Sequence, residues 1–239
     1  MKTVLVTGGG GAIGAAICRR FSKSMRVLVA DKNREAAERV AREVGGTALV
    51  FDIASYDHGK AALADRAVDV LVNNAGWDRF QNFVDTDPKE WDALIDINLR
   101  GPLNMHHLVL PQMLERGSGR IVNISSDAAR VGSSGESVYS ACKGGIISFS
   151  KTLAREVARK GITVNVVCPG PTDTPILRGF LGEGEAGKKV YDALVRAIPM
   201  KRVGQPDDIP GIVFFLASDE AGFITGQVIS VSGGLTMAG

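Results

Sequence analysis

The segment SVYSACKGG carries a tyrosine and a lysine four residues apart, Tyr139 and Lys143. Residues at this spacing share one face of a helix, so the phenol and the ammonium group are expected to lie side by side. Ser126 directly follows the apolar run GRIVNIS, thirteen residues upstream of the tyrosine, and Asn98 lies in LIDINLRGP. A tyrosine titrates near ~10, so proton transfer near neutral pH needs a stabilised phenolate, which a nearby ammonium group provides. The Tyr–Lys spacing alone is typical of an ordinary amphipathic helix, but together with Ser126 and Asn98 it makes a candidate catalytic set.

Four consecutive glycines follow the first apolar run, in TVLVTGGGGAIG at residues 3–14. The stretch fits two overlapping patterns, G-x-G-x-x-G and T-G-x-x-x-[G/A]-I-G, through the residues Gly8, Gly9, Gly11, Ala12, Ile13 and Gly14. Glycines let a backbone approach a pyrophosphate closely, and a helix N-terminus supplies N–H donors and a positive dipole. The pattern alone also fits a glycine-rich turn without an anion, but its place between a strand and a helix favours a dinucleotide site.

Asp31 follows the glycines by about 20 residues, at the end of the second apolar run. A carboxylate at this point would accept hydrogen bonds from the free ribose hydroxyls of NAD and would repel the 2′-phosphate of NADP. The sequence therefore predicts NAD as the cofactor, a preference that the adjacent Lys32 weakens. A solvated strand end is the alternative interpretation of Asp31.

Short apolar runs alternate with longer amphipathic stretches along the chain. The predicted strands span residues 3–7, 26–30, 47–51, 69–74, 119–125, 162–170 and 227–234. The predicted helices include residues 13–23, 33–43, 88–115, 138–159 and 207–217. Near-continuous apolar strands that alternate with helices are typical of a parallel sheet covered on both faces. We therefore predict an α/β fold, a single-domain doubly wound parallel sheet of Rossmann type with about seven strands.

This single domain is expected to span residues 1–239, with a cofactor half at 1–115 and a catalytic half at 116–239. Residues 171–205 interrupt the alternation and are rich in glycine, proline and charge. They follow a strand end, which is where open α/β sheets bind ligands. We predict that they form a mobile lid over the substrate.

Composition and charge argue against several classes of function. A formal net charge of +2 over 239 residues indicates neither nucleic acid nor an anionic membrane as a partner. No apolar run approaches a membrane span in length, and no signal peptide is evident. Cys18, Cys142 and Cys168 lie far apart in apolar or small-residue surroundings, which suggests reduced thiols in the cytoplasm. His106 and His107 lack a nearby carboxylate or cysteine, so we predict no metal site and place both in the core or an interface.

The chain resembles the short-chain dehydrogenase/reductase family over nearly its whole length. The glycine motif, NNAG, the Asn–Ser–Tyr–Lys set and CPGPTDT occur in the order and spacing of that family. The resemblance implies a nicotinamide cofactor and Tyr139 as the acid/base at the alcohol or carbonyl oxygen. It further implies that Ser126 hydrogen-bonds the same oxygen and that Lys143 binds the nicotinamide ribose. Asn98 would position a water in the proton relay.

The resemblance also implies where the cofactor lies. The residues it assigns are Asp52 and Ile53 at the adenine, Asn74, Ala75 and Gly76 at the ribose, Tyr139 and Lys143, and Pro169, Gly170, Thr172 and Thr174 at the nicotinamide. The chain departs from the family at Ala12, where glycine is more common, and in a short segment between residues 52 and 73. Alanine costs little where φ is negative, so we expect Ala12 to be tolerated with a slightly altered cofactor affinity.

Several blocks are more particular than the family pattern, among them NNAGWD, MHH, SSDAARVGSSGE and VSGGLTM. They are similar to the family's 2-hydroxycyclohexanecarboxyl-CoA dehydrogenases and, more distantly, to its 3-oxoacyl-acyl-carrier-protein reductases. The resemblance implies NAD-dependent oxidation of a cyclic or other β-hydroxyacyl-CoA thioester by a cytoplasmic homotetramer. Trp77 and Asp127 directly follow motif residues and are expected to border the substrate. The basic candidates for the CoA phosphates, each equally typical of a solvated lid, are Arg130, Arg178, Lys188 and Lys189.

Three other functions stay open from the sequence. A 3-oxoacyl-acyl-carrier-protein reductase shares the thioester chemistry, but Asp31 disfavours the NADP that biosynthetic reductases generally use. A dehydrogenase of a non-thioester alcohol would use the same catalytic residues. A non-catalytic NAD sensor on this fold is the alternative from another class. The intact Ser126–Tyr139–Lys143 set argues against it.

Overall fold

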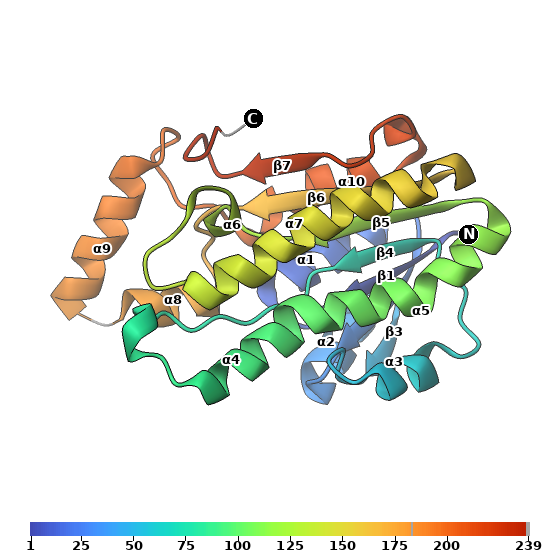
Figure 1. Cartoon of the computed structure of the whole chain (residues 1–239), viewed down its shortest axis with the longest axis horizontal. Helices are drawn as coiled ribbons and strands as arrows, with labels where there is room; N and C mark the ends of the chain where they lie inside the picture. The colour runs from blue at the N-terminus through green and yellow to red at the C-terminus, as the bar shows by residue number, and fades with distance from the viewer. Residues whose placement is uncertain (183, 238–239) are drawn as a thin grey trace.

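A computed structural model describes residues 1–182 and 184–237 of the chain (Figure 1). At its centre lies one seven-stranded sheet in the order β3-β2-β1-β4-β5-β6-β7, in which every neighbouring pair is parallel. The strands are β1 (Thr3–Thr7), β2 (Arg26–Asp31), β3 (Thr47–Val50), β4 (Val70–Asn73), β5 (Gly119–Ile124), β6 (Ile162–Pro169) and β7 (Val228–Val231). The predicted doubly wound fold is confirmed. The predicted lid includes Glu183 and the predicted domain includes residues 238–239, which lie outside the described residues.

Helices cover both faces of this sheet. They are α1 (Ala12–Phe21), α2 (Arg34–Val44), α3 (Tyr56–Leu63), α4 (Pro88–Ile95), α5 (Gly101–Arg116), α6 (Ala128–Val131), α7 (Ser137–Val157), α8 (Pro175–Leu181), α9 (Gly184–Ala197) and α10 (Pro210–Ala217). Short 3₁₀ turns are η1 (Phe83–Asp85), η3 (Ala158–Lys160), η4 (Pro206–Asp208) and η5 (Asp219–Ala221), and η2 (Asp96–Arg100) is a π-helical turn. Within the described residues no helix is long and apolar enough to cross a bilayer.

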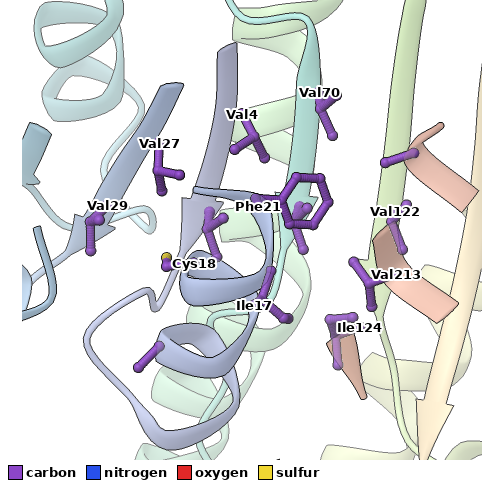
Figure 2. Packing of buried hydrophobic residues seen from close by; sticks show 14 of the residues in the cluster. Val4, Ile17, Cys18, Phe21, Val27, Val29, Val70, Val122, Ile124 and Val213 are labelled. Carbon is purple, nitrogen blue, oxygen red and sulfur yellow. The ribbon is translucent and has the colours of Figure 1, made fainter. Parts of the chain in front are cut away.

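Alternate strand residues divide the core into two layers. Side chains such as Val4, Val6 and Val122 point to one face, where they pack with α1, α2 and α10. Leu5 and Ile121 point to the other face, where α5 and α7 lie. Figure 2 shows the first layer, with the side chains of α1 directed at the strands. Because both faces are buried, every strand needs apolar residues at successive positions, which is why the runs are nearly continuous.

The predicted helix over residues 88–115 is helical throughout, but it contains a π-helical turn that the prediction did not include. The π-helical turn η2 lies between α4 and α5, and the Gly101 N–H donates to the Asp96 carbonyl. Pro102 follows directly and has no N–H to continue the usual α-helical bonding. The widened turn contains Asn98, one of the predicted site residues, and π turns of this kind are frequent at functional sites.

Two regions without a predicted helix are helical. Between residues 52 and 73 the chain forms α3, and the Ser55 side chain accepts a hydrogen bond from the His58 N–H at its start. In the predicted lid the chain forms α8 and α9, and the side chains of Leu177, Ile198 and Val203 make a small core there. Backbone hydrogen bonds from Gly204 to Pro171 (2.9 Å) and from Asp173 to Gly204 (2.8 Å) join the two ends of this segment. Residues 171–205 are therefore a folded excursion with a closed base.

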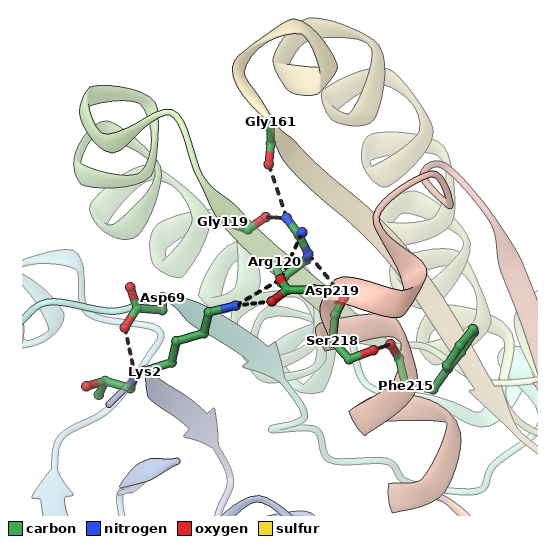
Figure 3. Close-up of polar contacts among 9 residues, drawn as sticks. Lys2, Asp69, Gly119, Arg120, Gly161, Phe215, Ser218 and Asp219 are labelled. Atoms are coloured by element: carbon green, nitrogen blue, oxygen red, sulfur yellow. Dashed lines mark hydrogen bonds and ion pairs between the residues drawn. The ribbon is translucent and has the colours of Figure 1, made fainter. Parts of the chain in front are cut away.

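A polar cluster ties the amino-terminal ends of the strands together (Figure 3). Arg120 donates to the carbonyls of Gly119, Gly161 and Ser218 and to the Asp219 carboxylate. Lys2 pairs with the same carboxylate at 2.9 Å. These contacts link β1, β5 and the segment before β7 at the edge of the sheet opposite the predicted site.

A second polar cluster is buried between the sheet and helices α5 and α7. His106 is 2% exposed, its Nδ1 donates to the Pro102 carbonyl, and its Nε2 accepts from the Asn123 amide at 3.2 Å. Asn123 also bonds Asn73 and Ser150. Burial lowers the pKa of His106 to about 4, so the imidazole is neutral at pH 7. His106 is thus a core histidine, while His107 is exposed and contacts the Tyr56 hydroxyl.

Candidate active site

The predicted catalytic side chains meet at the carboxyl-terminal edge of the sheet. Ser126 lies two residues after the end of β5, and Tyr139 and Lys143 lie on one face of the first turns of α7. All three line a cavity of about 500 Å³. The Ser125 hydroxyl donates to the Lys143 carbonyl at 2.9 Å, which fixes α7 against the end of β5. This contact holds Ser126, after β5, close to Tyr139 and Lys143 of α7 around the same cavity.

Tyr139 is a phenol in an environment that disfavours its anion. Burial, followed by the carboxylates of Asp78 and Glu136, raises the pKa of Tyr139 well above its ordinary value. A hydrogen bond with Ser126 acts in the opposite direction. The protonated phenol is therefore the resting form at neutral pH, which suits donation of a proton to a carbonyl oxygen. Removal of a proton from an alcohol needs additional positive charge beside the phenolate.

Lys143 is positioned to supply such charge. Its ammonium group donates to the Ile124 carbonyl at 3.1 Å and lies 5.7 Å from the centre of the Tyr139 ring. The side chain is 3% exposed, and burial lowers the pKa of Lys143 to about 8. Because the lysine is held by one backbone carbonyl, two of its three N–H donors are available to a ligand.

Asn98 lies one layer behind the cavity and does not line it. Its side chain is fully buried, donates to the carbonyls of Trp77 and Leu94, and accepts from the Trp77 N–H at 3.2 Å. The π-helical turn η2 directs this amide toward the segment after β4. Asn98 therefore holds the backbone around Trp77 in place, and its predicted role in a proton relay stays a prediction.

The glycine segment forms a close-packed turn between β1 and α1. Gly8 has φ of 61°, and a Cβ there would lie 2.7 Å from the Ala75 Cα. A Cβ on Gly14 would overlap the Gly8 carbonyl oxygen and lie 2.8 Å from the Asn74 amide nitrogen. Only glycine satisfies both positions, and the turn exposes the start of α1 to a second cavity of about 400 Å³.

Asp31 lies at the far end of this second cavity. One carboxylate oxygen accepts from the Gly10 N–H at 3.0 Å, and the other accepts from the Asn33 N–H at 2.9 Å. Arg39, the nearby guanidinium, donates to the Gly10 carbonyl at 3.1 Å. A carboxylate oxygen has two acceptor positions, so Asp31 retains capacity for ribose hydroxyls.

The two cavities adjoin, and each predicted cofactor residue lines one of them. Those at the second cavity are Gly8, Gly11, Ala12, Ile13, Gly14, Asp31, Asp52, Ile53, Asn74, Ala75, Gly76 and Thr174. Those at the first are Tyr139, Lys143, Pro169, Gly170 and Thr172. The glycine cradle, the helix N-terminus and the terminal carboxylate fit the pyrophosphate and ribose of a dinucleotide. Phe51 and Ile97 also line the second cavity, and no sequence motif marks them.

Ala12, the departure from the family pattern, occupies the first position of α1. Lys201 is the one non-glycine residue with positive φ in the described chain, so Ala12 has negative φ and its methyl group is not strained. We expect Ala12→Gly to change the dissociation constant of NADH less than tenfold, because the helical backbone is already compatible with alanine.

Fluorescence titration with NADH measures this effect. Gly14→Ala is the matched comparison, because its added methyl overlaps the Gly8 carbonyl, and we expect it to weaken NADH binding far more. A larger loss from Ala12→Gly than from Gly14→Ala would contradict the assignment of these residues.

The substrate-facing walls are mostly apolar and come from segments distant in sequence. Trp77 and Asp127, both predicted to border the substrate, line the first cavity. The rings of Phe80 and Phe180 lie 3.9 Å apart, which brings α8 against the segment after β4. Further lining residues that sequence reasoning missed are Asp78, Val131, Glu136, Ile176, Leu177, Leu194 and Leu235. Among the described residues, no group of three His, Cys, Asp or Glu side chains has the arrangement of a metal site.

The basic side chains considered for CoA phosphates are not equally available. Arg178 pairs with Asp173 at 2.8 Å in the exposed part of α8. Arg130 donates to the Ser230 hydroxyl at 2.6 Å, beside β7. Neither lines the first cavity in the described chain.

Known proteins match the chain along almost its whole length. The sequence model of a family described as Enoyl-(Acyl carrier protein) reductase matches residues 10–236. Acetoacetyl-CoA reductase from Shinella zoogloeoides is 42% identical over 240 residues, which cover 98% of this chain and 98% of that protein. The structure of a 3-oxoacyl-[acyl-carrier protein] reductase with bound NAD from Brucella melitensis has a TM-score of 0.91 at 34% identity and covers 99% of this chain and 92% of its own. The structure of a gluconate 5-dehydrogenase from Burkholderia cenocepacia, in complex with NADP and tartrate, has a TM-score of 0.93 at 32% identity. The match covers 100% of this chain and 96% of that chain.

Proposed function

Because the chain belongs to the short-chain dehydrogenase/reductase family, whose members are oxidoreductases that bind a nicotinamide cofactor, we propose that it oxidises a β-hydroxyacyl thioester with NAD. The preferred substrate is a cyclic or other β-hydroxyacyl-CoA, and the product is the β-ketoacyl-CoA. The observation that carries this proposal is the cavity of about 500 Å³ in which Ser126 and Tyr139 face apolar walls. A space of this size accommodates an acyl chain or ring at the reacting oxygen.

The proposed roles of the side chains follow from their positions. A bound nicotinamide cofactor supplies the hydride acceptor. In its phenolate form, Tyr139 Oη takes the proton of the substrate hydroxyl, and Ser126 Oγ hydrogen-bonds the same oxygen. The Lys143 ammonium group stabilises the phenolate and holds the nicotinamide ribose through its remaining donors. Asn98 keeps the segment after β4 in place and orders a water of the proton relay.

NAD is proposed over NADP because of Asp31. Its carboxylate lines the second cavity and already accepts two backbone N–H groups, so it is oriented toward that space. The related reductase from Brucella melitensis was solved with NAD and the related dehydrogenase from Burkholderia cenocepacia with NADP, so the fold accepts both. The negative charge of Asp31 is therefore the basis for proposing NAD over NADP.

Residues 171–205 are proposed as the substrate lid. Ile176, Leu177 and Phe180 of α8 and Leu194 of α9 line the first cavity. The excursion is joined at its base to Pro171 and Gly204, so it can adjust over the substrate without loss of the sheet. We also propose a cytoplasmic homotetramer, supported by the fully exposed ring of Phe223 and by free, buried cysteines.

An acyl-carrier-protein reductase and a dehydrogenase of a non-thioester alcohol are the alternatives. The first is supported by the relative from Brucella melitensis, and the second by the gluconate 5-dehydrogenase. Both would use the same Ser126, Tyr139 and Lys143.

The test is an absorbance assay of NADH and NADPH with purified protein in both directions. We expect turnover of 2-hydroxycyclohexanecarboxyl-CoA and 3-hydroxybutyryl-CoA with NAD, and little with NADP or the free hydroxy acids. Turnover restricted to acyl-carrier-protein thioesters, or to alcohols without a thioester, would replace the proposed substrate by the corresponding alternative.

A further inference from the structure

Two carboxylic acid side chains from separate segments meet in the wall of the first cavity. Asp78 follows β4 and Glu136 precedes α7, and both residues line the first cavity. A backbone hydrogen bond from Gln81 to Gly135, 2.9 Å long, clamps the two segments together. One oxygen of Asp78 accepts from the Arg79 N–H at 2.8 Å, and the other is buried without a hydrogen-bond partner. The pair is thus built into the fold beside Tyr139.

A third carboxylate lines the same cavity. Asp127 is 4% exposed, and one of its oxygens accepts from the Ser230 hydroxyl. Its other oxygen is buried and has no hydrogen-bond partner. Buried acceptors without donors are costly, so these sites favour a ligand that brings hydrogen-bond donors and disfavour one that brings another anion.

Positive charge in the wall is scarce. Lys143 is the one cationic side chain among the described residues that line this cavity, and it is held at Ile124 beside the phenol. Arg79 directs its guanidinium to Glu90. Burial and the neighbouring Glu136 raise the pKa of Asp78 to about 7, so this wall already resists a second negative charge. A carboxylate on the substrate would be repelled by the same negatively charged side chains.

We infer that Asp78, Glu136 and Asp127 exclude free hydroxy and keto acids from the cavity, so that the acyl group enters only as a neutral derivative such as a thioester. The inference rests on the proposed function and adds the reason for its substrate class. The related gluconate 5-dehydrogenase was solved with tartrate, a dicarboxylate, so this fold does not itself exclude carboxylates. In this chain, the exclusion of free acids comes from the side chains of Asp78, Glu136 and Asp127.

The experiment compares three substrates of one acyl group in the reductive direction with NADH: acetoacetyl-CoA, ethyl acetoacetate and acetoacetate. For the unaltered protein we expect kcat/KM to be at least about a hundredfold higher for ethyl acetoacetate than for acetoacetate, because a carboxylate close to several like charges is strongly disfavoured in a partly buried site. The assay is run at about pH 8, above the pKa of about 7 of Asp78, so that both carboxyl groups are ionised. Under this condition Asp78→Asn and Glu136→Gln each keep the shape of the side chain and remove a charge. Each is expected to narrow that ratio about tenfold or more. Asp65→Asn removes an exposed carboxylate remote from the cavity and should leave the ratio unchanged.

The outcomes separate this inference from the proposed function. Equal use of acetoacetate and ethyl acetoacetate by the unaltered protein overturns the inference, even if acetoacetyl-CoA is also reduced. A ratio that neither Asp78→Asn nor Glu136→Gln changes overturns it as well, and so does a failure to reduce either neutral derivative. Reduction of the ethyl ester without reduction of the CoA thioester removes the proposed function and leaves the inference standing.

Discussion

Tyr139→Phe is expected to lower turnover by about 10²- to 10⁴-fold, the scale of a general acid or base, while NADH binding is retained. The change removes one hydroxyl and keeps the ring that packs in the first cavity. The loss follows because Tyr139, which hydrogen-bonds Ser126, is the group proposed to exchange the proton at the substrate oxygen. The measurement is kcat with the best thioester of the NADH assay, together with a fluorescence titration of NADH.

Tyr56→Phe is the matched control for this substitution. Tyr56 lies at the start of α3, is 37% exposed, bonds His107 and lines neither cavity in the described chain. We expect full turnover from this variant. A Tyr139→Phe protein within tenfold of the unaltered enzyme would show that another group handles the proton. An undiminished biological activity without turnover would identify the chain as an NAD sensor.

Asp31→Asn is expected to shift the ratio of kcat/KM for NADP over NAD by about a hundredfold toward NADP. Two like charges about 4 Å apart near a protein surface repel by about 4 kcal/mol, which screening by solvent and salt reduces. The asparagine keeps an acceptor oxygen for one of the N–H groups of Gly10 and Asn33, so the turn is preserved while the charge is lost. The ratio is measured from initial rates over a series of NAD or NADP concentrations, at one fixed concentration of the substrate.

Asp57→Asn is the matched control for the charge at Asp31. Asp57 is an exposed carboxylate in the first turn of α3 and lines neither cavity in the described chain. An unchanged preference in Asp31→Asn would mean that Lys32 or the backbone decides the cofactor. A change of equal size in both variants would mean that overall charge decides it.

The fold could be predicted from the sequence because its strands are local patterns. Each strand is a short apolar run, and the alternation with amphipathic helices is visible without knowledge of tertiary contacts. The interruption at η2 could not be predicted in this way, because residues 88–116 keep a helical pattern while the hydrogen bonding changes at Gly101 and Pro102. Helices α8 and α9 were missed because glycine and proline in that segment are typical of loops.

The parts of the site that could be predicted are those whose residues lie close together in the sequence. Tyr139 and Lys143 are joined by helical spacing, and the glycines by one turn. Asp78 and Glu136 are far apart in the chain, and they meet because the segments after β4 and before α7 are clamped together. No single motif contains both residues, so the acidic wall becomes visible only in three dimensions.

The strand order has a consequence for synthesis of the protein on the ribosome. β1 to β4 all lie within the first 73 residues, so the half of the sheet that carries the glycine turn and Asp31 can pair early, as the chain emerges. The strand made last, β7, carries Ser230, which binds the Asp127 carboxylate in the wall of the first cavity. A nascent chain therefore makes the glycine turn and Asp31 early, whereas the part of the cofactor site around Thr174 and the wall of the substrate cavity can form only after most of the chain has been synthesised.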